Sequence, residues 1–214
     1  MKKHRQFLAL LICLVMSVSL LTGYFETKAA TEEPAQSGEQ DATQETAETR
    51  EITDMAGRKV TVPAAENIES VFSAGPVAAI FLYMVAPDKL LGWNYELNDV
   101  EKSIILDKYQ DLPNFGMGDA VNYEAVIAAN PTIAINSGKI NDAMVSDCDA
   151  LSESLGIPVV AVDNELNNSA EAFRFMGELL GVEDHAEELA QYAEQVFTDI
   201  NALSDIPEEK KVSV

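Results

Sequence analysis

The sequence predicts an α/β fold built on a parallel sheet, and three observations lead to this prediction. Apolar runs of strand length alternate with helix-like segments between Glu69 and Val162, as is typical of βα units with parallel strands. The strand candidates are apolar runs rather than alternating patterns, as expected when helices cover both faces of a sheet. After Gly181, apolar residues recur at spacings of three and four as far as Leu203, which predicts one long amphipathic helix.

The structured region is expected to open with a β-hairpin that is an appendage to the parallel sheet. Its two strands flank residues 54–57, with Gly57 at the turn, and Pro63 ends the second strand. The parallel strands are predicted at residues 70–73, 90–93, 114–116, 132–136 and 158–162. The helices between them are predicted at residues 76–85, 99–109, 122–129 and 141–155. Pro76 suits a first helical turn, and Asn122 is a favourable N-cap.

The C-terminal part of the chain has a different pattern. One helix is predicted over residues 169–180, and the long helix after Gly181 is expected to end before Pro207. Residues 211–214 then have the composition of a new strand, so we expect a chain cut short as a further α/β unit begins. The alternative is a natural C-terminal tail.

Residues 1–29 are predicted to be a signal peptide. Three basic residues precede an apolar run over residues 7–21, which is short for a membrane span of about 20 residues. Residues 27–29 offer a cleavage site, and the alternative is an uncleaved N-terminal anchor. A lipid anchor is not supported, because Tyr24 occupies the position at which a bacterial lipoprotein signal has its lipidated Cys. The protein is therefore expected to be exported, and to be periplasmic or associated with the cell surface.

Residues 30–50 are rich in Glu, Gln, Thr and Ala, and they are predicted to form a flexible acidic linker. Without residues 1–29 the chain has ten basic and 35 acidic side chains, a formal charge of −25. Such a surface repels nucleic acid, so nucleic acid is excluded as a partner, although the acids also serve solubility. Cys13 lies in the predicted leader, and Cys148 alone remains, so an intrachain disulfide is excluded in the mature chain.

Several short segments, in their order and spacing, resemble a known family. They are residues 52–58 with 60–63, 86–93, 122–124 with 130–131, and 155–160. Together they resemble the N-terminal lobe and interlobe helix of ABC-transporter solute-binding proteins of the iron–siderophore, haem and cobalamin class, which are class III periplasmic binding proteins. The resemblance implies two α/β lobes joined by one long helix, with ligand held between the lobes.

On this resemblance the chain divides into five parts. A signal peptide and a linker precede an N-terminal ligand-binding lobe at residues 51–168, a helical segment at 169–206 that contains the interlobe helix, and the start of a truncated second lobe at 207–214. The second lobe is otherwise absent. The implied partners are a small metal chelate or corrinoid and an ABC permease at the membrane. A monomer without a cofactor or a metal of its own is expected.

Two other functions are kept as alternatives. One is an extracellular sensor or interaction module that uses the same lobe without transport. The other is an extracellular hydrolase or metal-dependent enzyme. The sequence offers the enzyme little, because His4 lies in the predicted leader and His185 lies among acids on a helix. The sequence also has no nucleophile elbow, phosphate loop or metal-spaced His/Cys cluster.

The candidate ligand site follows from the predicted sheet, because ligands bind beyond the carboxyl ends of parallel strands. The residues at those ends are Ser73, Gly75, Trp93, Tyr95, Met117, Gly118, Asn136 and Ser137. Ser73 and Gly75 precede a helix N-terminus, which favours an anionic ligand group. The rings of Trp93 and Tyr95 are candidates for stacking on a flat ligand. The alternative is that the glycines form ordinary turns and that Trp93 belongs to the core.

Glu124 is predicted to lie in the first turn of a short helix, where the helix dipole favours an acid. That position alone explains the residue. The resemblance implies a further role, in which Glu124 docks onto arginines of the membrane permease.

Overall fold

The computed structural model describes residues 48–203 and Pro207. The predicted signal peptide, most of the predicted linker and the strand expected after Pro207 lie outside these residues. The structure therefore bears on residues of the predicted lobe and of the helical segment that follows it.

The chain opens with an antiparallel hairpin of β1 (Thr49–Thr53) and β2 (Lys59–Pro63). Strand β1 begins two residues inside the segment predicted as linker. The reason is tertiary, because the Arg50 guanidinium donates to the carbonyls of Glu178 and Leu179 at 2.7 and 2.9 Å and thereby fixes this part of the chain. The hairpin forms a separate sheet, but Val62 is fully buried in the main core, so the hairpin is not an appendage in its packing.

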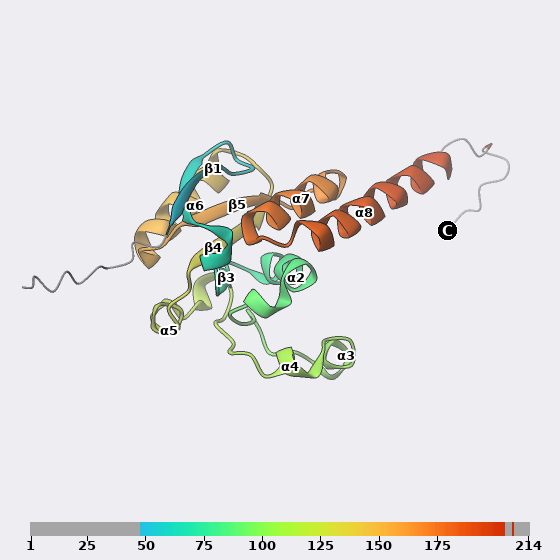
Figure 1. The fold of residues 1–214 in the computed structure, drawn as a ribbon. Helices are drawn as coiled ribbons and strands as arrows, with labels where there is room; N and C mark the ends of the chain where they lie inside the picture. Colours follow the sequence, from blue (N-terminus) through green and yellow to red (C-terminus); the bar gives the residue numbers. More distant parts are fainter. Residues whose placement is uncertain (1–47, 204–206, 208–214) are drawn as a thin grey trace, which may run out of the picture. The chain divides into compact units, whose positions relative to one another are not determined.

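A three-stranded parallel sheet forms the centre of the fold (Figure 1). Its order is β3 (Val71–Ser73), β4 (Ile133–Gly138) and β5 (Val159–Asp163), with β4 in the middle. Val71 lies opposite Ile133, and Ala134 lies opposite Val159. The predicted α/β fold with a parallel sheet is confirmed.

Helices cover both faces of this sheet, and each face has its own buried cluster. The α-helices on the first face are α2 (Pro76–Val85), α7 (Ser169–Leu180) and α8 (Glu183–Leu203). Those on the second face are α5 (Tyr123–Ala128) and α6 (Asp142–Leu155). Short 3-10 turns are η1 (Ala65–Asn67), η2 (Pro87–Lys89), η3 (Gly118–Ala120) and η4 (Leu166–Asn168). Because both faces are covered, the strands begin with apolar residues, and polar residues stand at or near their carboxyl ends.

Two predicted strands are reduced to single parallel bridges. Leu90 bridges Val71, and Trp93 bridges Asn114. The segment at Leu90 therefore lies beside β3, and the segment at Asn114 lies beside the one at Trp93. Pro113 has no N–H to donate, so the second ladder cannot extend toward its N-terminal end.

The single helix predicted over residues 99–109 is wrong. The structure has two short helices, α3 (Asp99–Lys102) and α4 (Asp107–Gln110), separated by a turn. The apolar spacing was misleading, because Val100, Ile104 and Leu106 are 69%, 75% and 59% exposed. Without a packed apolar face, nothing holds a continuous helix together.

The long helix is confirmed as one element, since α8 is unbroken over 21 residues. Its first half packs against α7, with Ala186 and Ala190 fully buried. Arg174 on α7 bonds Glu187 and Glu194 on α8 at 2.7 and 2.6 Å. Among residues 48–203, no helix has the length and apolar character needed to cross a membrane.

Candidate functional site

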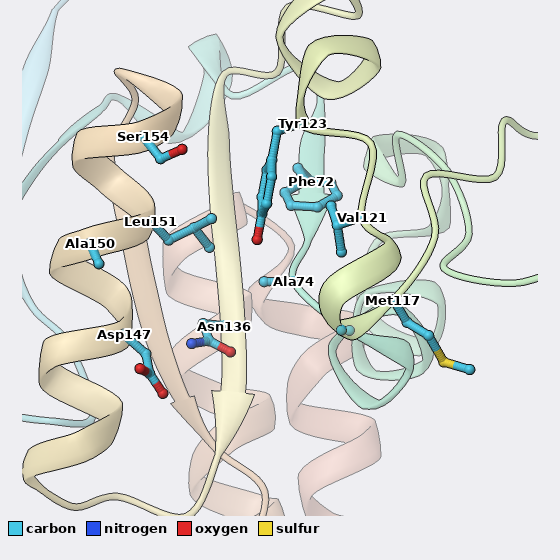
Figure 2. Close-up of a pocket in the computed structure, with 12 residues that line it drawn as sticks. Phe72, Ala74, Met117, Val121, Tyr123, Asn136, Asp147, Ala150, Leu151 and Ser154 are labelled. Atoms are coloured by element: carbon cyan, nitrogen blue, oxygen red, sulfur yellow. The ribbon is translucent and has the colours of Figure 1, made fainter.

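A pocket of about 350 Å³ lies on the second face of the sheet, between α6 and the segment that leads into α5 (Figure 2). Its floor is formed by residues of β3, β4 and the turn after β3. These are Phe72, Ala74, Gly75 and Asn136. Ala74 and Gly75 come directly after β3, so this part of the pocket lies at a strand carboxyl end, where ligands bind in parallel α/β sheets.

Helix α6 supplies one wall through residues spaced by three or four. They are Asp147, Ala150, Leu151 and Ser154. The adjacent stripe of the same helix buries Met144, Cys148 and Leu155 in the core. The helix is fixed at its start, where the Asn141 side chain accepts from the Met144 N–H at 3.0 Å, and at its end by Gly156 in the left-handed conformation.

The opposite wall comes from the segment between Gly116 and α5. It contributes Met117, Gly118, Val121 and Tyr123. Gly116 has a φ of 79°, and a Cβ there would collide with the Ala120 carbonyl. Asn122 caps α5 as predicted by accepting from the Ala125 N–H at 3.0 Å. This cap places Tyr123 in the first turn, and its ring points into the space above β4 (Figure 2).

Four of the eight predicted ligand residues meet in this pocket, namely Gly75, Met117, Gly118 and Asn136. Ser73 does not line it and is 1% exposed. Ser137 is the neighbour of Asn136 on β4 and therefore points to the other face of the sheet. The Tyr95 hydroxyl is bonded to Glu101 at 3.0 Å, and burial together with that carboxylate raises the pKa of Tyr95.

The structure places Trp93 in the core, which corrects the prediction that it stacks on a ligand. Its side chain is 2% exposed, and its Nε1–H donates to the Tyr109 carbonyl at 2.7 Å. Its ring centroid lies 5.7 Å from that of Tyr83. A ring enclosed in this way has no free face for a ligand.

The prediction also missed several lining residues, above all Tyr123 and Asp147. A signal for Asp147 was present, since Asp147, Ala150 and Ser154 form a small and polar stripe beside the apolar face of α6. Tyr123 lies within the segment that carried the family resemblance, but its direction depends on the cap at Asn122. Helical periodicity could therefore have indicated the α6 wall, whereas the direction of Tyr123 could not be predicted in this way.

The described residues offer little for catalysis. Cys148 is buried, and burial is the main cause that raises the pKa of its thiol, which makes it a poor nucleophile. Within residues 48–203, no group of three or more His, Cys, Asp or Glu side chains is placed to hold a metal ion. The pocket wall presents ring, amide and carboxylate groups with which it can bind a ligand.

Comparison with known proteins identifies the family. A family model described as periplasmic binding protein matches residues 77–214, more than half of the chain. The chain belongs to the periplasmic binding protein family. This is a family of binding proteins and not of enzymes, which removes support from the enzyme alternative.

Solved structures agree with this family on the fold. An ABC transporter solute-binding protein from Sulfurospirillum deleyianum has 22% identity and a TM-score of 0.64, with 76% of this chain and 52% of that chain covered. A TroA-like periplasmic binding protein, FepB, from Veillonella parvula has 26% identity and a TM-score of 0.54, with coverages of 74% and 50%. The molybdate-binding protein MolA of Haemophilus influenzae has 19% identity and a TM-score of 0.55, with coverages of 76% and 56%.

The chain thus spans about half the length of these periplasmic binding proteins. Among curated proteins, no match was found.

Proposed function

We propose that the chain supplies one wall of the ligand site in the substrate-binding component of an ABC importer. The observation that carries this proposal is the pocket of about 350 Å³ beside the carboxyl end of β3 in a member of the periplasmic binding protein family. Residues 51–168 would be the N-terminal lobe, and 169–206 would contain the helix that leads to a second lobe. Residues 207–214 would begin that lobe, and the component would act outside the cytoplasm.

The proposed ligand class is an iron–siderophore complex, haem or a corrinoid. In support, matched structures include the siderophore-binding protein BauB with acinetobactin and ferric iron, and the heme binding protein HmuT. The pocket wall combines apolar surface with the Tyr123 hydroxyl, the Asn136 amide and the Asp147 carboxylate, and none of its lining residues is basic. A bare oxyanion such as molybdate would meet a carboxylate here without a basic side chain on this wall, whereas a larger chelate can place apolar and hydrogen-bonding groups against the wall and its charge elsewhere.

Glu124 is proposed to dock onto a permease. The carboxylate is exposed in the first turn of α5 and follows Tyr123, a residue of the pocket wall. A permease that pairs a basic side chain with the Glu124 carboxylate would therefore contact the lobe beside the bound ligand. Charge pairs of this kind set the register and rate of association.

The experiment is a calorimetric titration of the chain with hemin, a ferric catecholate chelate, cyanocobalamin and molybdate. We expect weak binding by this chain alone, because losing about 4 kcal/mol of contacts from a second lobe lowers affinity roughly a thousandfold. Ligand concentrations should therefore extend to the millimolar range.

Two tyrosine variants make the titration specific to the pocket. Tyr123→Ala removes a ring from the pocket wall, and we expect about 1–3 kcal/mol weaker binding. Tyr192→Ala is the matched control, because Tyr192 lies on α8, is 72% exposed and does not line the pocket. Equal affinity in the two variants would refute this pocket as the ligand site, and stronger binding of molybdate than of the chelates would refute the proposed ligand class.

A further inference from the structure

Asn94 joins two loops that line the pocket, at residues 73–76 and 115–119. Its side chain is 2% exposed. Its Nδ2 donates to the Ser73 carbonyl at 3.0 Å and to the Gly116 carbonyl at 3.3 Å. We infer that Asn94 is a positioning residue that holds the two loops of the proposed ligand site at a fixed separation. This inference rests on the proposed function.

The backbone around Asn94 is itself held firmly. The Trp93 N–H donates to the Pro113 carbonyl at 2.8 Å, and the Phe115 N–H donates to the Trp93 carbonyl at 2.9 Å. Gly92 is needed for this approach, because a Cβ there would collide with the Pro113 carbonyl. The buried Trp93 ring anchors the same segment, so the Asn94 side chain starts from a fixed point.

Both carbonyls that Asn94 contacts come directly before lining residues of the pocket. Ser73 precedes Ala74 and Gly75, and Gly116 precedes Met117 and Gly118. One planar amide group bonds both loops, so a single side chain links them directly. The Ser73 hydroxyl lies 3.4 Å from Asn94 Oδ1 and donates to it, which fixes the orientation of the amide.

An amide suits this position because it has two donor hydrogens on one nitrogen and an acceptor beside it. A carboxylate of the same size would place a second oxygen against two carbonyl oxygens. An alanine would leave both carbonyls without this buried donor. Either change should free the loops from each other while leaving the hairpin and β5 intact.

The first test is hydrogen exchange measured by mass spectrometry on the 214-residue chain. Asn94→Asp and Asn94→Ala should raise exchange in peptides covering residues 73–76 and 115–119, with residues 49–63 unchanged. Asp54→Ala is the matched control, because Asp54 is also buried and bonded but joins the hairpin to β5. Asp54→Ala should raise exchange at residues 49–63 and leave the peptides of the two loops unchanged. A uniform rise across the chain in the Asn94 variants, or no rise in the two loops, overturns the inference.

The second test measures binding of whichever of the four probes binds most tightly to the unmodified chain. Asn94→Asp should weaken that binding roughly tenfold, because the loops must then be ordered on binding, whereas Asp54→Ala should leave it unchanged. Equal losses in both variants overturn the positioning role. If none of the probes binds, the proposed function fails, while the exchange pattern still decides whether Asn94 joins the loops.

A measurement on the unmodified chain covers the case in which the variants do not fold. In NMR spectra, the side-chain amide protons of Asn94 should exchange much more slowly than those of the exposed Asn167. Equal exchange rates would overturn the inference, because they would show that the amide is not bonded between the loops.

Discussion

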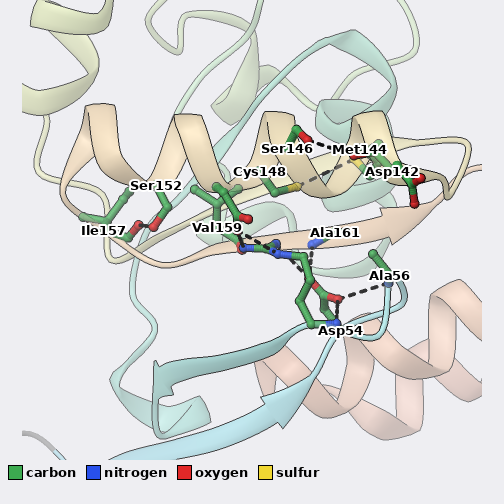
Figure 3. A network of polar contacts seen from close by, with 12 residues as sticks. Asp54, Ala56, Asp142, Met144, Ser146, Cys148, Ser152, Ile157, Val159 and Ala161 are labelled. Atoms are coloured by element: carbon green, nitrogen blue, oxygen red, sulfur yellow. Dashed lines mark hydrogen bonds and ion pairs between the residues drawn. The ribbon is translucent and has the colours of Figure 1, made fainter.

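Removing the Asp54 carboxylate should detach the N-terminal hairpin from the sheet. Asp54 is 4% exposed and lies in the turn between β1 and β2. Its Oδ2 accepts from the Ala161 N–H of β5 at 3.1 Å and from Arg58 Nη1 at 3.0 Å, and its Oδ1 accepts from the N–H groups of Ala56 and Arg58 (Figure 3). One buried carboxylate therefore closes the turn and ties it to the sheet.

The structure sets the magnitude of the effect. Asp54→Ala leaves the Ala161 N–H without this acceptor and removes the buried partner of Arg58. Breaking a buried ion pair on one side costs about 3–5 kcal/mol, and we expect the free energy of unfolding to fall by that amount. Arg58 keeps its contact with Asp149 at 2.8 Å, but that partner is exposed and compensates little.

Urea denaturation followed by fluorescence measures this change. Trp93 is the only tryptophan and is buried, so its emission reports loss of the core. Glu51→Ala is the control, because Glu51 pairs with Lys59 at 2.7 Å on the same hairpin but in an exposed setting. That variant should lose no more than about 1 kcal/mol.

The reasoning would be refuted if Asp54→Ala and Glu51→Ala lost the same free energy with an unchanged dependence on urea. Equal losses would mean that the bonds to β5 add nothing beyond a surface pair. A large loss for Asp54→Ala alone would confirm that the buried bonds of Asp54 stabilise the fold more than an exposed pair does.

Three further predictions concern single side chains. Trp93→Phe should lower the free energy of unfolding by about 1–3 kcal/mol, because the Tyr109 carbonyl loses a buried donor, and should leave probe affinity unchanged; weaker binding at unchanged stability would return Trp93 to the ligand site. Arg174 holds the pKa of Glu187 at about 2, below its ordinary value of 4.5. The stabilisation from this pair should therefore be complete above about pH 4.5 and be lost as the pH falls toward 2. Acid unfolding followed by circular dichroism should show this pH-dependent loss of stability in the unmodified chain and not in Arg174→Gln. In a transporting system, Glu124→Ala should impair uptake without changing ligand affinity, and the opposite pattern would place Glu124 in the ligand site.

Local signals in the sequence were sufficient for most of the helices. The boundaries of α6 follow from a cap at Asn141 and a glycine at Gly156, and both devices act within one helical turn. The long α8 follows from the unbroken spacing of its apolar residues, because the period of a helix is fixed by its own geometry. The same reasoning predicted that β4 and β5 are buried on both faces.

The candidate site was predictable only in part. Gly75, Met117, Gly118 and Asn136 were predicted to lie together because the carboxyl ends of parallel strands converge at one edge, and all four line the pocket. The α6 wall was missed because the rule of strand ends considers only residues that follow strands. The helical spacing of its residues was a signal, but their contact with the sheet depends on the packing of the helix. The direction of each side chain in the pocket is a property of that packing.

The sequence by itself determined the type and order of the main elements, because caps, turns and periodicity depend on neighbours a few residues away. The tertiary structure alone decided which polar and aromatic groups are buried. Trp93 became a core residue through Tyr83 and Tyr109, and residues 99–109 failed to form one helix because Val100 and Ile104 found no partner surface. The burial of these side chains depends on contacts between separate segments, and the local pattern around each residue did not indicate those contacts.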